Sequence, residues 1–229
     1  MSYTILLMDA DETLLDFRRS EGFALERTLQ SYGVAMTPAI HDAYHEINRV
    51  LWQQLERGEI ARSALRTVRF ERLFAQIGLQ GVDADAFNTA YMQTLGGTGF
   101  LLPGALELLR DLHTRFRVYL VTNGTASVQH TRLQHSGMLP FLHGVFISEE
   151  VGADKPSERF FEHVLSSIGN PDKREVLVIG DSLTSDIEGG RRMGLDTCWY
   201  APDPAASANN IEPTYRVASF DELRSLLAV

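Results

Sequence analysis

The chain of 229 residues lacks the marks of secreted, membrane-bound and nucleic-acid-binding proteins. It has one cysteine, Cys198, which excludes an intrachain disulfide and is typical of a reducing compartment, so we expect a cytoplasmic protein. No apolar run approaches the ~18 residues of a membrane span, and no signal-peptide pattern opens the sequence, so we expect no membrane association. A formal net charge of −9 argues against a nucleic-acid partner, whose binding surface is basic.

Lysine is almost absent. Lys155 and Lys173 stand against nineteen arginines, so arginine serves the surface. Lys173 lies in the polar stretch 170–174, where a solvated side chain is expected. Lys155 lies between an aspartate and a proline, and its compact ammonium suits a confined site better than a guanidinium does.

Short apolar runs alternate with helical patterns in most of the chain. This alternation is typical of βαβ units, and it predicts a doubly wound, Rossmann-like parallel sheet whose ligands bind beyond the carboxyl ends of the strands. The expected strands are Thr4–Met8, Val118–Thr122, Gly144–Ser148, Val176–Gly180 and Thr197–Tyr200. The expected core helices are 102–114, 127–136, 158–167 and 185–193, and a capping-box pattern at 219–222 predicts a last helix.

The alternation is interrupted after the first strand by four amphipathic helical patterns, over residues 20–32, 38–57, 63–77 and 83–95. We therefore expect a four-helix cap domain over 16–97, inserted into an α/β core made of 1–15 and 98–229. The glycine-rich segment 96–99 is a candidate hinge, and 202–213 is expected to be a surface loop.

Polar side chains follow the expected strands at the points where they end. Asp9 and Asp11 come directly after the first strand, and because they are two residues apart they point to the same side of an extended chain. Like charges so placed are costly unless a cation or an anionic substrate requires them. The other segments are Thr122-Asn123-Gly124, Asp154-Lys155-Pro156, and Gly180-Asp181-Ser182 with Asp186 in the next helix.

In this order the motifs resemble the haloacid dehalogenase superfamily, most members of which are Mg²⁺-dependent phosphatases. The resemblance covers the whole chain: Asp-x-Asp-x-Thr at 9–13, a threonine after the second strand, a lysine, and Gly-Asp followed by Asp186. True dehalogenases of the family have no acid at the second position, whereas this chain has Asp11. The resemblance implies an enzyme that hydrolyses phosphate monoesters through an aspartyl-phosphate intermediate.

The family pattern also implies a role for each residue. A phosphate dianion repels a carboxylate nucleophile unless a cation intervenes, and Mg²⁺ prefers carboxylate and carbonyl oxygens. Asp9 is the expected nucleophile and a metal ligand, Asp181 a second ligand, and the Asp11 carbonyl a third. The Asp11 carboxyl is the expected general acid and base. Mg²⁺ is the expected cofactor, with Mn²⁺ as a substitute.

The remaining motif residues are expected to hold the substrate and balance charge. Thr122 and the amides near Asn123 and Gly124 are candidate phosphoryl-binding groups, and Lys155 is expected to offset charge on the nucleophile and the phosphate. Asp186 has three open interpretations: it binds the metal through water, it orients Lys155, or it is an ordinary acid favoured by the start of a helix.

Finer features resemble one subfamily, the bacterial pyrimidine 5′-nucleotidases that act on UMP, dUMP, dTMP and noncanonical nucleotides. These features are Glu12, where most relatives have glycine, and the segments 9–14, 48–52, 147–152 and 169–172. The subfamily implies that the cap covers the base, with Phe17, Asn48 and Trp52 as candidate contacts. For Phe17 and Trp52, plain packing within the protein is the competing interpretation.

Two alternatives remain open at this point. The first is a sugar-phosphate phosphatase or phosphomutase, since these enzymes share the core and the helical cap. The second is a catalytically silent relative with a regulatory role. The expected partner is a small phosphate monoester, and the chain is expected to be a monomer or a homodimer.

Overall fold

The computed structural model describes residues 3–208 and 210–229, which form two compact units. One unit comprises Met1–Asp16 and Gly99–Val229, and the other comprises Phe17–Thr98. We call the first the sheet unit and the second the helical unit. Both boundaries fall one residue later than the ranges expected from the sequence.

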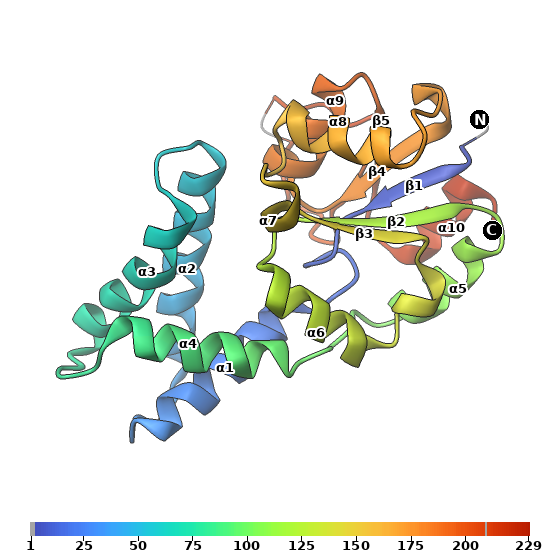
Figure 1. Cartoon of the computed structure of the whole chain (residues 1–229). Coiled ribbons are helices and arrows are strands. Elements are labelled where there is room, and N and C mark those ends of the chain that lie inside the picture. Colours follow the sequence, from blue (N-terminus) through green and yellow to red (C-terminus); the bar gives the residue numbers. More distant parts are fainter. Residues whose placement is uncertain (1–2, 209) are drawn as a thin grey trace. The chain divides into compact units, whose positions relative to one another are not determined.

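The sheet unit is built on six parallel strands in the order β3-β2-β1-β4-β5-β6 (Figure 1). The prediction of a doubly wound parallel sheet is confirmed. The central strand β1 pairs in register with both neighbours, because Ile5 lies opposite Arg117 of β2 and Val176 of β4. The strands are β1 (Ile5–Met8), β2 (Arg117–Thr122), β3 (Gly144–Ile147), β4 (Val176–Gly180), β5 (Asp196–Tyr200) and β6 (Tyr215–Val217). The strand β6 was not predicted.

Helices cover both faces of this sheet, which explains why β1 is an unbroken apolar run rather than an alternating one. Leu6 and Met8 belong to the apolar core that includes side chains of α5, α6 and α10. Ile5 and Leu7 belong to the opposite core, with side chains of α8 and with Met193, which directly follows α9. The helices are α5 (Ala105–His113), α6 (Ala126–Ser136), α8 (Glu158–Ser167), α9 (Glu188–Arg192) and α10 (Phe220–Leu227).

Short helical turns join these elements: α7 (Ser148–Val151), η1 (Leu139–Phe141), η2 (Lys173–Glu175) and η3 (Leu183–Ile187). The single helix expected over 185–193 is wrong in detail, because its first part is the π-helical turn η3 and only Glu188–Arg192 is α-helical. The wider turn lets Asp186 fold back, and its carboxylate accepts a 3.1 Å hydrogen bond from the Ser182 N–H. Turns of this kind are frequent at functional sites.

The helical unit consists of α1 (Phe17–Ser31), α2 (Pro38–Glu56), α3 (Arg62–Ile77) and α4 (Ala84–Gly96). Thr37 caps α2 by accepting a hydrogen bond from the Ile40 N–H, and Gly78 ends α3 in the left-handed conformation with φ of 69°. The unit is filled by aromatic rings, with Phe70 lying 4.8 Å from Phe87 and 5.2 Å from Tyr91 between ring centroids.

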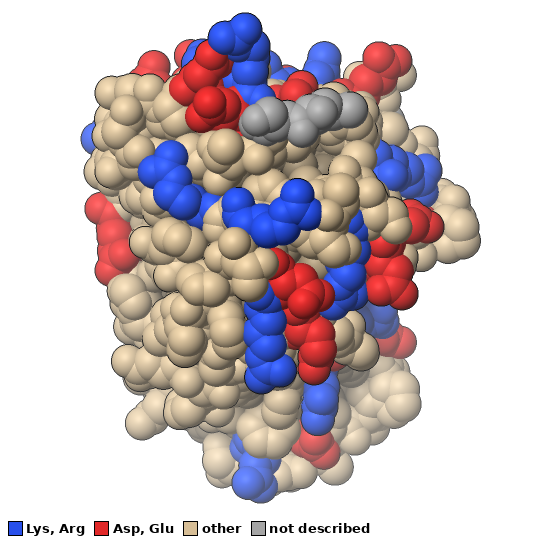
Figure 2. Space-filling model, turned by 90° about the vertical axis from the view of Figure 1, so that its right-hand side faces the viewer, with Lys and Arg blue, Asp and Glu red and all other residues tan. Residues whose placement is uncertain are grey.

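Basic and acidic side chains are interspersed on the face of the molecule drawn in Figure 2, as is usual where a surface meets water. Within residues 3–208 and 210–229, every helix is too short or too polar to cross a bilayer.

Candidate active site

The site lies at the point where the strand order reverses. The strand β1 has β2 on one side and β4 on the other, and in sheets of this kind the ligand crevice opens beyond the carboxyl ends of those strands. Asp9 follows β1 and Asp181 follows β4 directly. A 2.8 Å hydrogen bond from the Asp9 N–H to the Ile179 carbonyl extends the pairing of the two strands to this point. The topology therefore delivers both acids to one edge.

Three carboxylates converge there. One oxygen from each of Asp9, Asp181 and Asp186 lies within 4.8 Å of the others. Burial raises the pKa of Asp9 to about 7, with the charges of Asp186 and Asp11 adding to the shift and Lys155 opposing it. Burial, followed by the charges of Asp9 and Asp186, also raises the pKa of Asp181 well above its usual range. A cluster of carboxylate oxygens that repel one another, two of the three groups being buried, fits a hard divalent cation such as Mg²⁺.

Lys155 balances part of this charge. Its Nζ donates hydrogen bonds of 2.6 Å to Asp9, 2.6 Å to Asp186 and 2.8 Å to the Val121 carbonyl. The side chain is 1% exposed, and these three bonds use all the hydrogens of an ammonium. Burial would lower the pKa of Lys155, but the adjacent charges of Asp186 and Asp9 raise it instead, so the group stays charged. Of the three interpretations of Asp186, the observed contact is the one to Lys155.

Asn123 holds the lysine segment in place. Its side chain donates to the Lys155 carbonyl at 2.9 Å and accepts from the Lys155 N–H at 2.8 Å. Asn123 directly follows β2, so this pair of bonds ties the end of that strand to the segment that carries the ammonium. The sequence motif predicts that the main-chain amides near Asn123 bind phosphate. The Asn123 side chain instead binds the main chain of Lys155.

Asp181 is fixed by residues from other elements. The Thr13 hydroxyl accepts from the Asp181 N–H at 3.1 Å and donates to its carboxylate at 3.3 Å. The indole N–H of Trp199 on β5 donates to the Asp181 carbonyl at 2.8 Å. Thr13 is 1% exposed, so the third residue of the Asp-x-Asp-x-Thr motif serves to position the β4 acid.

Asp11 lies apart from the three converging carboxylates and contacts α6. One oxygen accepts a 2.6 Å bond from Arg132, and the other accepts a 3.0 Å bond from Gln129. Both partners are 1% exposed. Sequence reasoning missed Gln129 and Arg132 because neither follows a strand. The available signal was their spacing of three residues, which places two polar side chains on one face of a helix.

Gln129 also contacts Thr122, the last residue of β2. Its hydroxyl oxygen accepts hydrogen bonds from the Gln129 side chain at 2.8 Å and from the Gly124 N–H at 3.2 Å. Gly124 has no side chain for a steric reason: a Cβ there would lie 2.4 Å from Gln129 Cγ. The second sequence motif and the helix after it thus form one packed unit.

The three candidate base contacts lie in the helical unit. Asn48 is 2% exposed and donates a 2.8 Å hydrogen bond to Glu21, which also contacts His45 at 2.8 Å. Trp52 is half-buried, with the Arg62 guanidinium 5.4 Å from its ring centroid, and Phe17 is the half-buried first residue of α1. Contact of these residues with a base stays a prediction.

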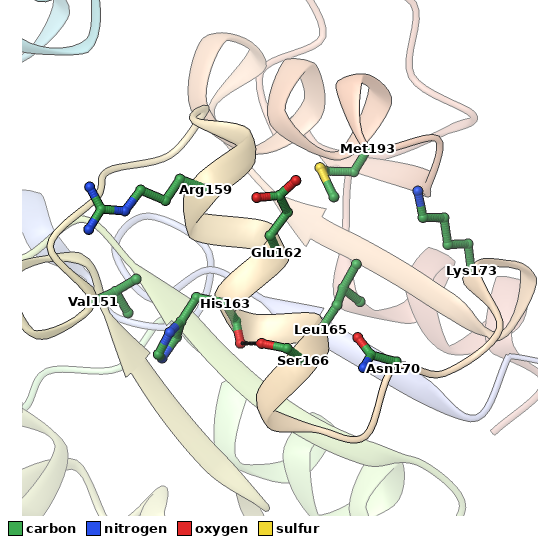
Figure 3. A pocket seen from close by; sticks show the side chains of 9 residues that line it. All are labelled: Val151, Arg159, Glu162, His163, Leu165, Ser166, Asn170, Lys173 and Met193. Carbon is green, nitrogen blue, oxygen red and sulfur yellow. Dashed lines mark hydrogen bonds between the residues drawn. The ribbon is translucent and has the colours of Figure 1, made fainter.

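A cavity of about 580 Å³ lies beside α8 and includes none of the acids (Figure 3). Arg159, Glu162 and Lys173 contribute charged side chains to its lining, and Leu165 and Met193 contribute apolar ones. The Ser166 hydroxyl in its lining donates to the main-chain carbonyl of His163 at 2.9 Å, and Glu162 is its one carboxylate. The three converging carboxylates lie outside this cavity.

The fold and this edge define a class: a doubly wound α/β protein with a cluster of aspartates where the strand order reverses. The family described as haloacid dehalogenase-like hydrolase matches residues 3–194. The chain belongs to this family and is a hydrolase.

Two pyrimidine 5′-nucleotidases are similar to the chain over nearly its whole length. The chain is 40% identical to the pyrimidine 5′-nucleotidase PynA of Streptococcus pneumoniae, covering 99% of this chain and 96% of that protein. It is 34% identical to the pyrimidine 5′-nucleotidase YjjG of Escherichia coli, with 99% of each covered. A crystal structure of the HAD-hydrolase YfnB of Bacillus subtilis, bound to magnesium, superposes with a TM-score of 0.95 at 35% identity and full coverage of both chains.

Proposed function

We propose that the protein is a Mg²⁺-dependent phosphatase of pyrimidine nucleoside 5′-monophosphates that acts through phospho-Asp9. The observation that carries the proposal is the convergence of Asp9, Asp181 and Asp186 around Lys155 at the strand-order reversal. A structural ion pair needs one carboxylate for one ammonium, whereas three carboxylates, two of them buried, leave an excess of negative charge that is costly to bury. In phosphoryl transfer this excess negative charge holds a cation, and the cation in turn holds the anionic substrate.

The nucleophile is the Asp9 carboxylate. One of its oxygens attacks phosphorus, the bond from phosphorus to the 5′ oxygen breaks, and an acyl phosphate forms on Asp9. Lys155 holds the carboxylate in a fixed orientation through the 2.6 Å bond to its Oδ1 and places a positive charge beside the developing negative one. When bound, Mg²⁺ at Asp9 and Asp181 would neutralise charge on the transferring phosphoryl group. The main-chain carbonyl of Asp11 is the further ligand implied by the family pattern.

The general acid and base is Asp11. Its proton goes to the leaving 5′ oxygen, and the resulting carboxylate then takes a proton from the water that hydrolyses phospho-Asp9. Arg132 and Gln129 use only two of the roughly four acceptor positions of its carboxylate, so positions remain for the proton that it transfers.

The phosphoryl group is held by Thr122. A hydroxyl has one donor and two acceptor positions, and both acceptor positions of Thr122 are filled by Gln129 and by the Gly124 N–H. Its hydrogen is therefore directed to an acceptor, and the oxygens of an ionised phosphate are acceptors only. The amides near Asn123 and Gly124 are the further candidates for this task, although the Gly124 N–H itself already donates to Thr122 at 3.2 Å.

The substrate class rests on the relatives. PynA and YjjG are pyrimidine 5′-nucleotidases by name, and the helical unit supplies Phe17, Asn48 and Trp52 as candidates for contact with the base. Aromatic rings stack on bases, which suits Phe17 and Trp52. The Asn48 amide is 2% exposed and donates to Glu21, so its contact with a base would require this side chain to be released first.

Phosphate release tests the proposal. The purified protein would be assayed with Mg²⁺ on UMP, dUMP, dTMP, purine nucleotides and sugar phosphates, with 4-nitrophenyl phosphate as a general substrate. We expect the highest kcat/KM on a pyrimidine nucleotide, and none in EDTA. A preference for sugar phosphates would refute the nucleotidase assignment. Phosphate moving between sugar positions with little net release would identify a phosphomutase, and inactivity on all substrates would indicate a silent relative.

A further inference from the structure

The side chains of Gln129 and Arg132 form a chain of hydrogen bonds that ends at both Asp11 and Thr122. Arg132 donates to the Gln129 amide oxygen at 2.9 Å and to Asp11 at 2.6 Å. The Gln129 amide nitrogen donates to Asp11 at 3.0 Å and to Thr122 at 2.8 Å. An amide nitrogen has two hydrogens, so these two bonds use its full donor capacity.

The direction of every bond in this chain is fixed by chemistry. A guanidinium donates only, so the Gln129 atom that faces Arg132 must be the oxygen, and the nitrogen must face the other way. Both Asp11 oxygens accept in this chain, one from the Arg132 guanidinium and the other from the Gln129 amide nitrogen. Arg132 thereby sets the orientation of Gln129, and Gln129 in turn makes the Thr122 oxygen an acceptor.

Burial makes this arrangement costly to disturb. Arg132 and Gln129 are each 1% exposed, and a buried charge keeps its partners because the alternative is an uncompensated charge. The space for Gln129 exists because residue 124 has no Cβ, which would otherwise lie 2.4 Å from Gln129 Cγ. Helix α6 therefore holds both side chains at fixed positions against the ends of β1 and β2.

We propose that Gln129 and Arg132 are positioning residues for the reaction: they hold the Asp11 carboxyl at the leaving oxygen and direct the Thr122 hydroxyl at the phosphoryl group. The inference rests on the proposed phosphatase function and adds two residues to it. The side-chain amide of Gln129 joins Asp11, which moves the proton, to Thr122, which holds the phosphate. The two residues therefore cannot shift independently.

The role of Asp11 as an acid gives a specific readout. A nucleoside 5′ oxygen needs a proton to leave, whereas 4-nitrophenolate leaves as an anion without one. Misplacing Asp11 therefore slows the formation of phospho-Asp9 from a nucleotide more than from 4-nitrophenyl phosphate. Its role as a base in the second step is common to both substrates, so the two are compared by kcat/KM, which reports the first step. A residue that only supports the fold changes both rates by the same factor.

The experiment compares kcat and KM on UMP and on 4-nitrophenyl phosphate for Gln129→Met and Arg132→Met. The control is Gln134→Met, the same change at an exposed position of the same helix. We expect kcat/KM on UMP to fall about 100-fold or more in the two variants, in the range of general acid catalysis, and at least about tenfold further than kcat/KM on the aryl phosphate. Arg132→Lys, which keeps a cationic donor, should recover part of the UMP rate.

A second readout does not depend on turnover. Inorganic phosphate binding by calorimetry should weaken in Gln129→Met, because the Thr122 hydroxyl is no longer directed, and should be unchanged in Gln134→Met. If the Met variants fail to fold by circular dichroism, Gln129→Asn and Arg132→Lys are judged by the same ratio of UMP to aryl phosphate rates. An unchanged ratio in folded variants overturns the inference, while an inactive wild-type protein would instead refute the proposed function.

Discussion

Asp186 accepts a 2.6 Å hydrogen bond from Lys155, and both side chains are 1% exposed or less. The same ammonium reaches Asp9 at 2.6 Å, so the lysine joins an acid on β1 to an acid in the turn after β4. Replacing Lys155 by Met leaves buried carboxylates without this cation. We expect a loss of about 3–5 kcal/mol in the free energy of unfolding, measured by urea titration in EDTA, and no phosphate release.

Lys173 provides the matched control, since it is the other lysine of the chain and is exposed. Lys173→Met should change the free energy of unfolding by less than about 0.5 kcal/mol, as is usual for surface substitutions. Equal effects of the two substitutions would show that Lys155 has no special electrostatic role.

Asp9→Asn should abolish phosphate release while leaving the fold intact, because an amide is a poor nucleophile of the same shape. Asp11→Asn should retain Mg²⁺ binding better than turnover, because its proposed metal contact is through the main-chain carbonyl. Phosphate release and Mg²⁺ titration calorimetry on both variants check this pair of expectations. Near-normal turnover in Asp9→Asn would remove the covalent mechanism.

Asp181→Asn should stabilise the metal-free protein and weaken its response to Mg²⁺. The neighbouring charges of Asp9 and Asp186 raise the pKa of Asp181 beyond the effect of burial, so removing its charge relieves repulsion. We expect a gain of about 0.5–2 kcal/mol in EDTA. The wild-type protein should gain about 2.7 kcal/mol at a Mg²⁺ concentration about 100 times its Kd, and the variant should gain less at the same concentration. Thermal unfolding with and without Mg²⁺ measures both quantities, and a variant less stable in EDTA would contradict the argument.

Gly180→Ala should lower activity by displacing the Asp186 carboxylate. A Cβ at residue 180 would lie 2.2 Å from the Asp186 carboxylate, which must then move and take the Lys155 ammonium with it. Overpacking of this kind costs about 1–3 kcal/mol, and we expect kcat to fall with little change in KM. Steady-state kinetics together with urea unfolding test this, and a variant with wild-type kcat would show that Asp186 can relax freely.

Glu12→Gly should raise stability even though it removes a side chain. Glu12 has φ of 60°, a conformation that costs roughly 1–2 kcal/mol for a residue with a Cβ, against about 0.4–1 kcal/mol for the extra freedom of glycine in the unfolded chain. Its charge also adds to the repulsion that raises the pKa of Asp181. Glu12→Gln removes the charge but keeps the backbone conformation, so it should gain less than Glu12→Gly in thermal unfolding. The reverse order would show that the backbone conformation carries no strain.

The sheet was predictable because β1, β2 and β4 are apolar runs that end in polar residues, and period and composition alone indicate such strands. The strand β6 has three residues, one of them exposed, and owes its conformation to pairing with β5 rather than to its own pattern. The π turn at Leu183–Ile187 is set by the tertiary contacts of Asp186, which no local pattern encodes.

Asp9 and Asp181 come together as expected from topology, since carboxyl ends of parallel strands meet at one edge. Lys155 follows α7 rather than a strand and reaches Asp9 from the segment between α7 and α8. Gln129 and Arg132 could not be found in this way. A helix presents several faces, and which one meets β1 depends on how α6 packs, which the sequence does not state locally. Their roles, like those of the motif residues, are for the experiments above to decide.

The two points at which the chain passes between the units lie close together within the sheet unit. The Asp16 N–H donates a 2.9 Å hydrogen bond to the Phe100 carbonyl, and Leu15 pairs with Leu101 as an antiparallel bridge. The chain therefore departs and returns through neighbouring backbone positions, as at the base of a hairpin. Such a junction makes the helical unit exchangeable in principle: a different insert, or a short linker, can be joined at the same two residues without rerouting any strand of the sheet. Diversity of substrates within a family of this architecture then requires only that the insert change, while the acids at the end of β1 and β4 stay where the sheet puts them.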